Sequence, residues 1–302
     1  MNRRIFIKNT FVSSAFLPIA GLGFQACGNE RKKHLTILHT NDVHSQIDPY
    51  ESTHPMYPNM GGAAKRATLI AQVRKENPNT LLLDAGDIFQ GTPYFNFYGG
   101  ELEMKLMSMM GYDAATLGNH DFDNSIDGLL AQMPNTKFSL LTANYDFSNT
   151  VMASYVKPYQ VFVKDGIRIG VFGLGIELKG LVDPRMYKET KYIDPIEIAQ
   201  DTTRKLKQEE RCDLIICLSH LGYRYEHDKV SDEVLAAQTQ DIDLIIGGHT
   251  HTLMETPATV FNKNGKEVII NQVGYKGVFM GRIDFFFDAS GAVTASQKLA
   301  VV

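Results

Sequence analysis

Asp42 and His44 are the first residues of this chain whose types and spacing suit the binding of a metal ion. They follow an apolar run and lie two positions apart. Two residues apart on an extended strand end, their side chains point to the same side. One carboxylate and one imidazole aimed at a common point are what a pair of metal ligands requires. For this motif alone, a polar loop in which Asp42 caps a helix is the alternative.

Four further polar motifs offer ligand atoms of the same kind. Asp87 follows a glycine that permits a tight turn, and its two oxygens could bridge two cations. Asn119 can give a neutral carbonyl oxygen to a hard cation, which leaves His120 free to point towards a substrate. His220 follows an apolar run, and the motif 247–251 places two imidazoles two residues apart. A lone histidine in such a place is more often structural.

All five motifs occupy the same place relative to a predicted strand. The apolar runs that precede them are 35–38, 81–83, 114–117, 214–218 and 244–246. Short runs that are apolar throughout are typical of strands buried on both faces. Ligands gather beyond the carboxyl ends of strands in open α/β sheets, so we expect the five motifs to meet there. Their nitrogen and oxygen atoms favour Mn²⁺, Zn²⁺, Fe²⁺, Co²⁺ or Ni²⁺ over a Cys-rich structural zinc.

Helical patterns and hairpins separate these strands. Helices are predicted over 63–75, 101–110, 126–133, 195–210 and 231–238. Hairpins are predicted over 159–172, 260–273 and 280–296, the first with Asp165-Gly166 as its turn. Strands that alternate with helices indicate an α/β fold of mostly parallel order, and the hairpins add antiparallel pairs. Two packed sheets with helices outside, in one globular domain, would accommodate both.

The composition of the chain limits the kinds of partner that we expect it to bind. The chain has 302 residues, 44% of them apolar, and a formal net charge of −4. This is enough for a sizeable core, and the charge argues against a protein that coats a nucleic-acid polymer. In a mildly acidic protein, bound metal ions would supply a local positive charge.

The N-terminus is predicted to be an export segment over residues 1–27. Arg3 and Arg4 resemble a twin-arginine signal, and the apolar stretch near 11–24 is too short for a membrane span. Cys27 follows a small residue, as at the cleavage site of a bacterial lipoprotein, and would become the lipidated residue. Plain export with cleavage near Ala26, or a short retained anchor, is the alternative. Residues 28–33 are predicted to be a tether, and the protein is expected in the periplasm or cell envelope, attached to a membrane only through this lipid or signal.

The other two cysteines are Cys212 and Cys217. Their odd separation along a predicted strand would place them on opposite faces, so buried free thiols are expected rather than a disulfide.

The five motifs together resemble the blocks of the calcineurin-like metallophosphoesterase superfamily. The stretches 39–44 (His-Thr-Asn-Asp-x-His) and 117–123 (Leu-Gly-Asn-His-x-Phe-Asp) resemble, more narrowly, the catalytic domain of the 5′-nucleotidase family. The resemblance runs from about Leu35 to the end of the chain, so 34–302 is expected to be the catalytic domain. It implies a four-layer α/β/β/α sandwich with mixed sheets.

The resemblance also implies a role for each site residue. One divalent ion would be held by Asp42, His44, Asp87 and His251. The second would be held by Asp87, Asn119, His220 and His249. Asp87 bridges the two ions, and the position of His251 is often Gln in bacterial periplasmic relatives. His120 would stabilise the phosphoryl transition state or protonate the leaving oxygen, and Asp123 would orient His120, unless it only caps a helix.

The implied activity is the hydrolysis of phosphate esters, most simply of nucleotides. Two cations would generate a hydroxide that attacks phosphorus in line. A phosphodiesterase on cyclic nucleotides, a broad-specificity or sugar phosphatase, and a non-catalytic metal-binding surface lipoprotein are the alternatives. Family members continue into a second, substrate-binding domain that is not found in this chain. We expect a separate nucleotide-binding polypeptide to supply it, although weak specificity without any partner would also fit.

Overall fold

The computed structural model of the protein describes residues 32–288 and 293–302. The predicted export segment, Cys27 and most of the predicted tether lie outside the described residues. Lys33, which was assigned to the tether, is the first residue of β1. Among the described residues, no helix has the length and apolar character needed to cross a membrane.

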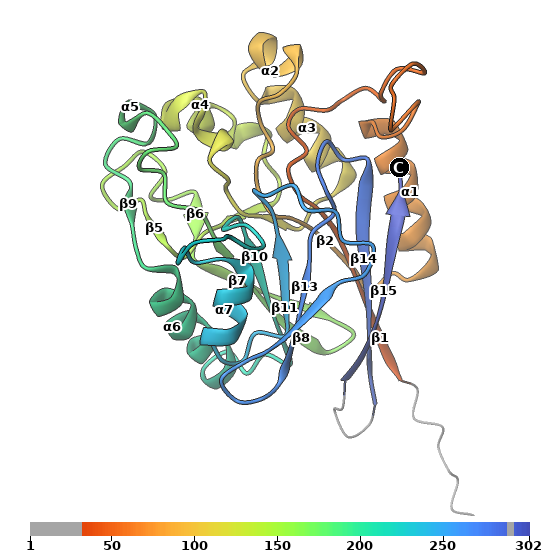
Figure 1. Ribbon diagram of the computed structural model, residues 1–302, viewed down its shortest axis with the longest axis vertical. Coiled ribbons are helices and arrows are strands. Elements are labelled where there is room, and N and C mark those ends of the chain that lie inside the picture. The colour runs from red at the N-terminus through yellow and green to blue at the C-terminus, as the bar shows by residue number, and fades with distance from the viewer. Residues whose placement is uncertain (1–31, 289–292) are drawn as a thin grey trace, which may run out of the picture. The chain divides into compact units, whose positions relative to one another are not determined.

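Strands and helices alternate along much of the described chain (Figure 1). They are β1 (Lys33–Thr40), β2 (Thr80–Asp84), β3 (Ala114–Ala115), β4 (Ser139–Leu141), β5 (Tyr145–Asp146), β6 (Val156–Lys157), β7 (Tyr159–Lys164), β8 (Ile167–Leu174), β9 (Lys191–Tyr192), β10 (Leu214–Ser219), β11 (Leu244–Gly247), β12 (Ala258–Phe261), β13 (Glu267–Asn271), β14 (Phe279–Phe287) and β15 (Val293–Val301). The α-helices are α1 (Ala63–Glu76), α2 (Pro93–Tyr98), α3 (Glu101–Met110), α4 (Ser125–Ala131), α5 (Pro184–Tyr187), α6 (Pro195–Gln208) and α7 (Asp232–Gln238). Two 3₁₀ turns cover His120–Phe122 and Met133–Asn135.

Two large sheets carry the fold. A seven-stranded sheet has the order β15-β14-β1-β2-β3-β4-β6, and a six-stranded sheet has the order β12-β13-β11-β10-β8-β7. The central strands of both sheets run parallel, whereas β14, β15, β7 and β12 join antiparallel to their neighbours. A third, two-stranded sheet pairs β5 with β9. Both large sheets are therefore mixed, as predicted.

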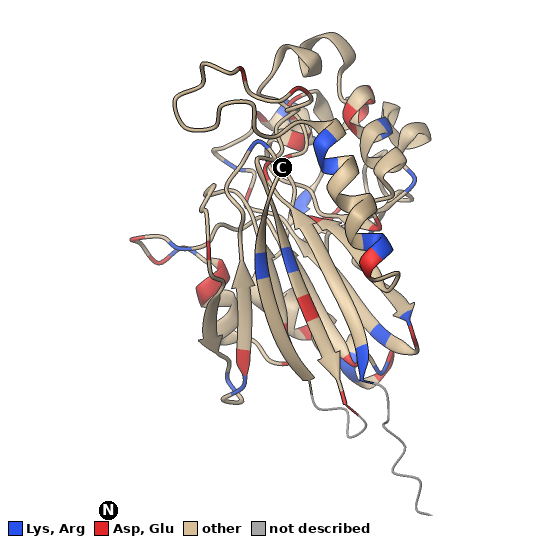
Figure 2. Ribbon diagram, turned by 90° about the vertical axis from the view of Figure 1, so that its right-hand side faces the viewer, with Lys and Arg blue, Asp and Glu red and all other residues tan. Residues whose placement is uncertain are grey.

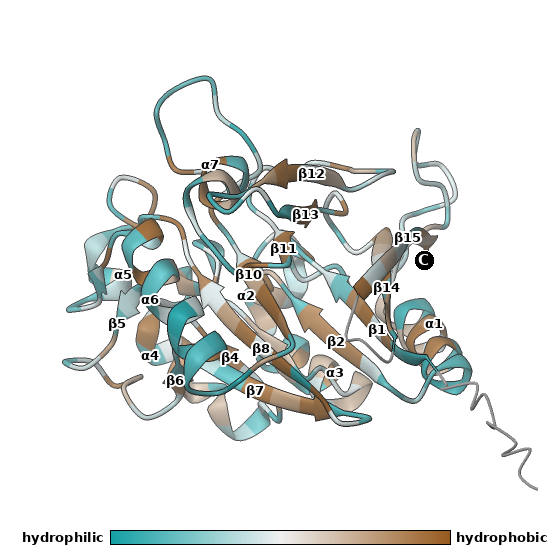
Figure 3. Ribbon diagram, turned by 90° about the horizontal axis from the view of Figure 1, so that it is seen from below, coloured by the Kyte–Doolittle hydropathy of each residue, from teal (hydrophilic) through white to brown (hydrophobic). Residues whose placement is uncertain are grey.

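Three apolar clusters show how the layers are stacked. Ile37 and Leu83 of one sheet pack with Val171, Ile216 and Ile246 of the other, so the sheets face each other. The opposite face of the seven-stranded sheet packs against α1, α3 and α4, and that of the six-stranded sheet against α6 and α7. This confirms the four-layer α/β/β/α sandwich. The apolar strands lie inside the more polar helices in Figure 3, and basic and acidic residues are interspersed on the face seen in Figure 2.

Local sequence signals account for several element ends. Asp194 accepts hydrogen bonds from the backbone N–H groups of Ile196 and Glu197, and Pro195 opens α6. Asp165 and Gly166 both have positive φ, of 51° and 75°, as a tight hairpin turn requires. All three predicted hairpins form, as β7–β8, β12–β13 and β14–β15.

The five predicted helices also form, with no end shifted by more than two residues. The strand predicted over 114–117 is shorter in the structure, where β3 covers only Ala114–Ala115. Cys212 and Cys217 are buried and free, as predicted. They are not on opposite faces, because Cys212 lies before β10 and both belong to the cluster beneath α6 and α7.

The backbones of the two sheets come into direct contact at Gly173 of β8. The N–H of Ala143 donates to the carbonyl of Gly173 at 2.8 Å. A Cβ atom at Gly173 would lie 1.9 Å from the carbonyl oxygen of Leu141 and 2.6 Å from Thr116 Oγ1. The sandwich therefore requires glycine at this position.

We expect Gly173→Ala to lower the free energy of unfolding by about 3 kcal/mol or more, since a backbone clash must be relieved by moving a sheet. Urea denaturation measures this loss. Gly265→Ala is the control: φ is +70° there and nothing lies within 4 Å of its Cβ position, so only the backbone penalty of about 1–2 kcal/mol applies. Equal losses for the two variants would contradict close sheet contact as the cause.

Candidate metal centre

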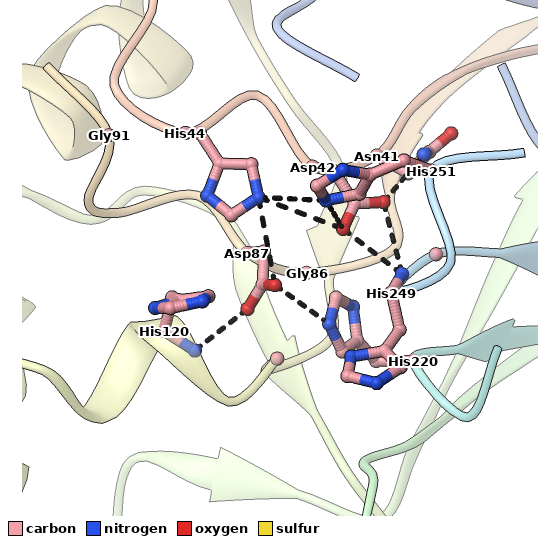
Figure 4. A network of polar contacts seen from close by, with 12 residues as sticks. Asn41, Asp42, His44, Gly86, Asp87, Gly91, His120, His220, His249 and His251 are labelled. Carbon is pink, nitrogen blue, oxygen red and sulfur yellow. Dashed lines mark hydrogen bonds and ion pairs between the residues drawn. The ribbon is translucent and has the colours of Figure 1, made fainter. Parts of the chain in front are cut away.

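The seven predicted ligands converge where the parallel strands of both sheets end. Asp42, Asp87 and Asn119 follow β1, β2 and β3, which are neighbours in the seven-stranded sheet. His220 and the 249–251 motif follow β10 and β11, neighbours in the six-stranded sheet. The site therefore lies across the carboxyl edges of two facing sheets. Figure 4 shows Asp42, His44 and Asp87 grouped with His220, His249 and His251.

Asp42, His44 and His251 form the first group of candidate ligands. Their ligand atoms all lie within 4.8 Å of one another. The Nε2 atom of His251 is 3.3 Å from Asp42 Oδ1, and that of His44 is 4.0 Å from the same oxygen. The two Nε2 atoms are 3.1 Å apart. Asp42 and His44 are buried, whereas the side chain of His251 is 40% exposed, so this group is open to solvent on one side.

Asp87, His220 and His249 form the second group, again with ligand atoms within 4.8 Å of one another. The Nε2 atom of His220 is 3.0 Å from Asp87 Oδ2. Asn119 joins the group through its Oδ1 atom, which lies 2.9 Å from Nδ1 of His249. This set combines one carboxylate, one amide oxygen and two imidazoles.

Asp87 lies between the two groups. Its Oδ2 atom is 3.8 Å from Nε2 of His44 as well as 3.0 Å from Nε2 of His220. Its Oδ1 atom accepts a hydrogen bond from the backbone N–H of His120 at 2.8 Å. One carboxylate thus faces imidazoles from both sheets, which is the position of a bridging ligand.

Hydrogen bonds to the backbone orient two of the imidazoles. Nδ1 of His220 lies 2.7 Å from the carbonyl oxygen of Ala85, and Nδ1 of His44 lies 3.2 Å from that of Phe89. A carbonyl only accepts, so each Nδ1 carries a proton and each Nε2 is the nitrogen that faces the carboxylates. The Nε2 atom of His220 is buried and lies 3.0 Å from Asp87 Oδ2. A metal cation can replace a proton at a nitrogen held in this way.

Five of the seven candidate ligands have a left-handed backbone. The φ values lie between 49° and 69° at Asp42, His44, Asp87, His249 and His251. Only a few per cent of non-glycine residues adopt this conformation, and it persists where the surroundings hold it. The backbone of these loops is therefore strained at the residues whose side chains point into the site.

Glycines allow these loops to approach one another. A Cβ atom at Gly118 would lie 2.2 Å from Asp87 Oδ1, and one at Gly248 would lie 2.8 Å from Nδ1 of His220. A Cβ atom at Gly86 would lie 2.6 Å from the backbone nitrogen of Gly118. Any side chain at these positions would push the ligands apart.

The electrostatics of the second group favour a cation. Burial opposes a charge on His220, but the carboxylate of Asp87 outweighs it and raises the pKa of His220 to about 10. Burial likewise opposes a charge on Asp87, yet His220 holds the pKa of Asp87 below its usual range. Burial and the charge of His220 lower the pKa of His249 to about 4. A place that attracts a proton so strongly also attracts a metal ion, which binds the same lone pairs.

His120 and Asp123 stand beside the two groups. Nδ1 of His120 is 2.7 Å from Oδ2 of Asp123, and both side chains are partly exposed, at 38% and 30%. The hydrogen bond to Asp123 raises the pKa of His120, in spite of partial burial. Asp123 therefore contacts the imidazole directly, and its carboxylate makes no helix-capping hydrogen bond at the start of α4, where Asn124 is the cap residue.

Sequence reasoning assigned no role to Asp121. Its buried carboxylate accepts hydrogen bonds from the backbone N–H groups of Asp87, Ile88, Phe89 and Gly118, at 2.8–3.1 Å. Burial raises the pKa of Asp121 to about 7. An acid next to a candidate catalytic histidine was the available signal, but only the fold shows which N–H groups it binds.

A second unpredicted support comes from the segment 273–276. The side-chain amide of Asn41 donates to Asp42 Oδ2 and to the carbonyl of Gly274, both at 2.7 Å. The ring of Tyr275 stacks on His251 with centroids 4.9 Å apart. Lys276 donates its backbone N–H to the carbonyl of Asp42 at 2.7 Å. The β13–β14 connection thus holds the first group from outside.

Two further groups of residues can be placed in the fold. His39 is buried, and its Nε2 atom lies 2.8 Å from the Asn271 amide nitrogen. Of the aromatic residues that follow the second ligand loop, Phe95 is buried, whereas Phe97 is 83% exposed.

The residues present fit two divalent cations. Both groups consist of nitrogen and oxygen donors without a thiolate, and one carboxylate lies between them. Such donors suit imidazole- and carboxylate-binding ions such as Mn²⁺, Zn²⁺ and Fe²⁺.

Comparison with known proteins agrees with this geometry. Residues 35–253 match the family model of the calcineurin-like phosphoesterases. The trifunctional nucleotide phosphoesterase protein YfkN of Bacillus subtilis is 35% identical over 301 residues, which cover 89% of this chain and 19% of that protein. The 5′-nucleotidase of Rattus norvegicus is 34% identical over 284 residues, 87% of this chain and 48% of that protein.

A solved structure has a similar fold. The 5′-nucleotidase precursor from Thermus thermophilus superposes with a TM-score of 0.81 at 32% identity, over 89% of this chain and 55% of that one. The chain thus spans about half the length of these relatives, or less. With the family match over most of its length and the strand-end site in place, the chain belongs to the calcineurin-like phosphoesterase family.

Proposed function

We propose that this protein hydrolyses phosphate esters, nucleotides foremost, at a centre of two divalent metal ions. The observation that carries the proposal is the position of Asp87, whose carboxylate faces imidazoles of both ligand groups. A centre with one ion would not need two converging groups that share a carboxylate. The names of the relatives in the same family, nucleotide phosphoesterase and 5′-nucleotidase, support the class of substrate.

Each ion has a proposed set of ligands. The first would be held by Asp42, His44, Asp87 and His251. The second would be held by Asp87, Asn119, His220 and His249. When bound, two such ions supply Lewis-acid stabilisation of phosphoryl oxygens and make a water nucleophilic near neutral pH. The protein's own part is to hold the ligand lone pairs in place and to exclude competing hydrogen-bond partners.

His120 is the proposed catalytic group that touches the substrate. Its Nδ1 atom is engaged by Asp123, so its Nε2 atom can donate to a phosphoryl oxygen or protonate the leaving oxygen. Asp123 favours the protonated form of His120 and fixes the plane of its ring. Asp123 is therefore a positioning residue.

The nucleoside-binding part of the enzyme is a separate question, because much of each relative lies outside the matched region. We propose that a nucleotide-binding domain on another polypeptide completes the pocket. Affinity purification of the native protein tests this: recovery of no nucleotide-binding partner, together with tight nucleotide binding by the chain alone, would reject it.

We also propose export with lipidation at Cys27, by a twin-arginine route. The support is the sequence pattern of residues 1–27. Fractionation and metabolic lipid labelling of Cys27→Ser against the natural protein test it. Equal labelling of the two proteins would reject lipidation at this residue.

Asp87→Ala should remove the shared anchor of both ions. We expect metal content to fall from about two ions per chain towards zero and activity to fall more than about 100-fold, beyond the loss typical of a group that only supports a ligand. Elemental analysis and p-nitrophenyl phosphate hydrolysis measure these changes. Asp127→Ala, an exposed acid paired with Lys188, is the matched control. A folded, fully active Asp87→Ala protein would refute the assignment.

Asp123→Asn should change the pH profile rather than the metal content. Asp123 raises the pKa of His120, so protonated His120 persists to higher pH in the natural protein. Without the carboxylate this pKa falls, and the alkaline limb of kcat/KM should move to lower pH while activity on the acid side is retained. Identical pH profiles would show that Asp123 does not act through His120.

Substrate preference separates the activities that the family supports. With Mn²⁺ added, we expect p-nitrophenyl phosphate to be hydrolysed faster than bis-p-nitrophenyl phosphate, and nucleoside 5′-monophosphates faster than cyclic nucleotides or sugar phosphates. Faster cleavage of the diester would favour a phosphodiesterase. No turnover of any substrate, with two metal ions bound, would favour a non-catalytic metal-binding protein.

A further inference from the structure

A small cavity is lined by the residues on either side of His44 in the sequence, Val43 and Ser45. The rest of its wall comes from Ile47, Arg66 of α1, Ile88, Tyr112, and Glu103, Leu106, Met107 and Met110 of α3. About 20 Å³ is open to the centres of water molecules, and about 10–15 Å³ is enough to hold one. The cavity is therefore of the size of a single water molecule.

Four polar atoms of residues that line this cavity lack a hydrogen-bond partner among the described groups. They are Ser45 Oγ, Arg66 Nε and both carboxylate oxygens of Glu103. Ser45 is fully buried, and Arg66 and Glu103 are each only 3% exposed. Buried polar atoms almost always have partners, and a buried carboxylate without one is especially costly. Their gathering around one cavity points to a common partner.

The charges around the cavity define that partner. Arg66 disfavours a cation, and Glu103 disfavours an anion. A neutral molecule that both donates and accepts hydrogen bonds fits both, because it can donate to the carboxylate of Glu103 and accept from Nε of Arg66. Ser45 offers a third partner, and buried water molecules typically make about three hydrogen bonds.

The neighbouring contacts connect this cavity with His44. Both terminal nitrogens of Arg66 donate to the carbonyl of Gln46 at 3.3 Å. His44 and Ser45 have consecutive left-handed backbones, with φ of 49° and 54°. Two such residues in a row cost energy and need a rigid support. Arg66 thus binds the backbone two residues after His44, next to this strained stretch.

We propose that the cavity binds one water molecule that bridges Arg66 and Glu103, and that this hydrated pair positions His44. The water site and the coupling between Arg66 and Glu103 do not depend on the proposed function. The positioning of His44 as a ligand rests on the proposed two-metal function.

A crystal structure at a resolution that shows ordered water tests the site directly. We expect a water peak within about 3.2 Å of Glu103 and of Arg66 Nε. A direct Arg66–Glu103 ion pair, or a cavity without density, would overturn the proposal.

A double-mutant cycle tests the coupling. Glu103→Gln and Arg66→Met should each lower the folding equilibrium constant about 10- to 100-fold, because each leaves the other group uncompensated. The double variant should lose much less than the product of the two single losses. Additive losses would overturn the bridge. If Arg66→Met does not fold, Arg66→Lys, which keeps the charge but not the Nε donor, takes its place in the cycle.

Neighbouring residues on the same helices serve as controls. Glu101→Gln removes an exposed acid from α3 that pairs with Lys105, and Lys65→Met removes an exposed base from α1. Both should leave folding within about twofold of the natural protein, as surface substitutions usually do.

Metal titration tests the positioning of His44. In Glu103→Gln, we expect the affinity for one of the two Mn²⁺ ions to fall about 10- to 100-fold, the range for groups that support a ligand, while the other changes less than about twofold. His44→Ala provides the reference for loss of that ion. Two unchanged affinities would overturn the positioning role. A natural protein that binds no divalent ion would instead refute the proposed function, and the crystal structure and the cycle would still decide on the water.

Discussion

A carboxylate that is buried away from water is stable only if nearby groups compensate its negative charge. The site is built around this requirement at Asp87. Its side chain is 2% exposed, and it is faced by His44 from one sheet, by His220 from the other and by the N–H of His120. Burial alone would favour the neutral acid, yet the surrounding groups hold the pKa of Asp87 low. The charge needed to hold cations therefore survives inside the fold.

Such compensation is possible only where two sheets end together. The parallel order of β1, β2 and β3 brings three loops to one edge, and β10 and β11 bring two more to the facing edge. The sheets pack face to face through an apolar layer, which sets their separation. Direct backbone contact at Gly173 keeps it small. Apolar packing thus fixes the distance between the two sheets, and this distance brings the ligand loops of both sheets together.

The loops carry strain that the rest of the structure balances. Left-handed backbones at Asp42, Asp87 and His249 would relax if the loops were free. Asp121 binds three backbone N–H groups of the loop after β2 and one of the loop after β3, and the segment 273–276 holds the first group from the other side. That segment lies beyond the 35–253 family match, so part of the support comes from chain that the match does not cover. A rigid, strained site of this kind is suited to holding ions without rearrangement.

The sequence by itself determined the strands and the polar residues that follow them, because both are local patterns. Apolar runs that end in Asp, Asn or His predicted five strands, whereas the four layers and the assignment of ligands to each ion came from the resemblance to a known family. All seven candidate ligands came together because strand direction places every carboxyl end at one edge. The tertiary structure decided what periodicity does not record. Which N–H groups Asp121 binds, that His39 lies in the core, and that Arg66 and Glu103 line one cavity all depend on contacts between residues far apart in sequence. Burial and pairing of single polar atoms are properties of the packed chain, and no local pattern contains them.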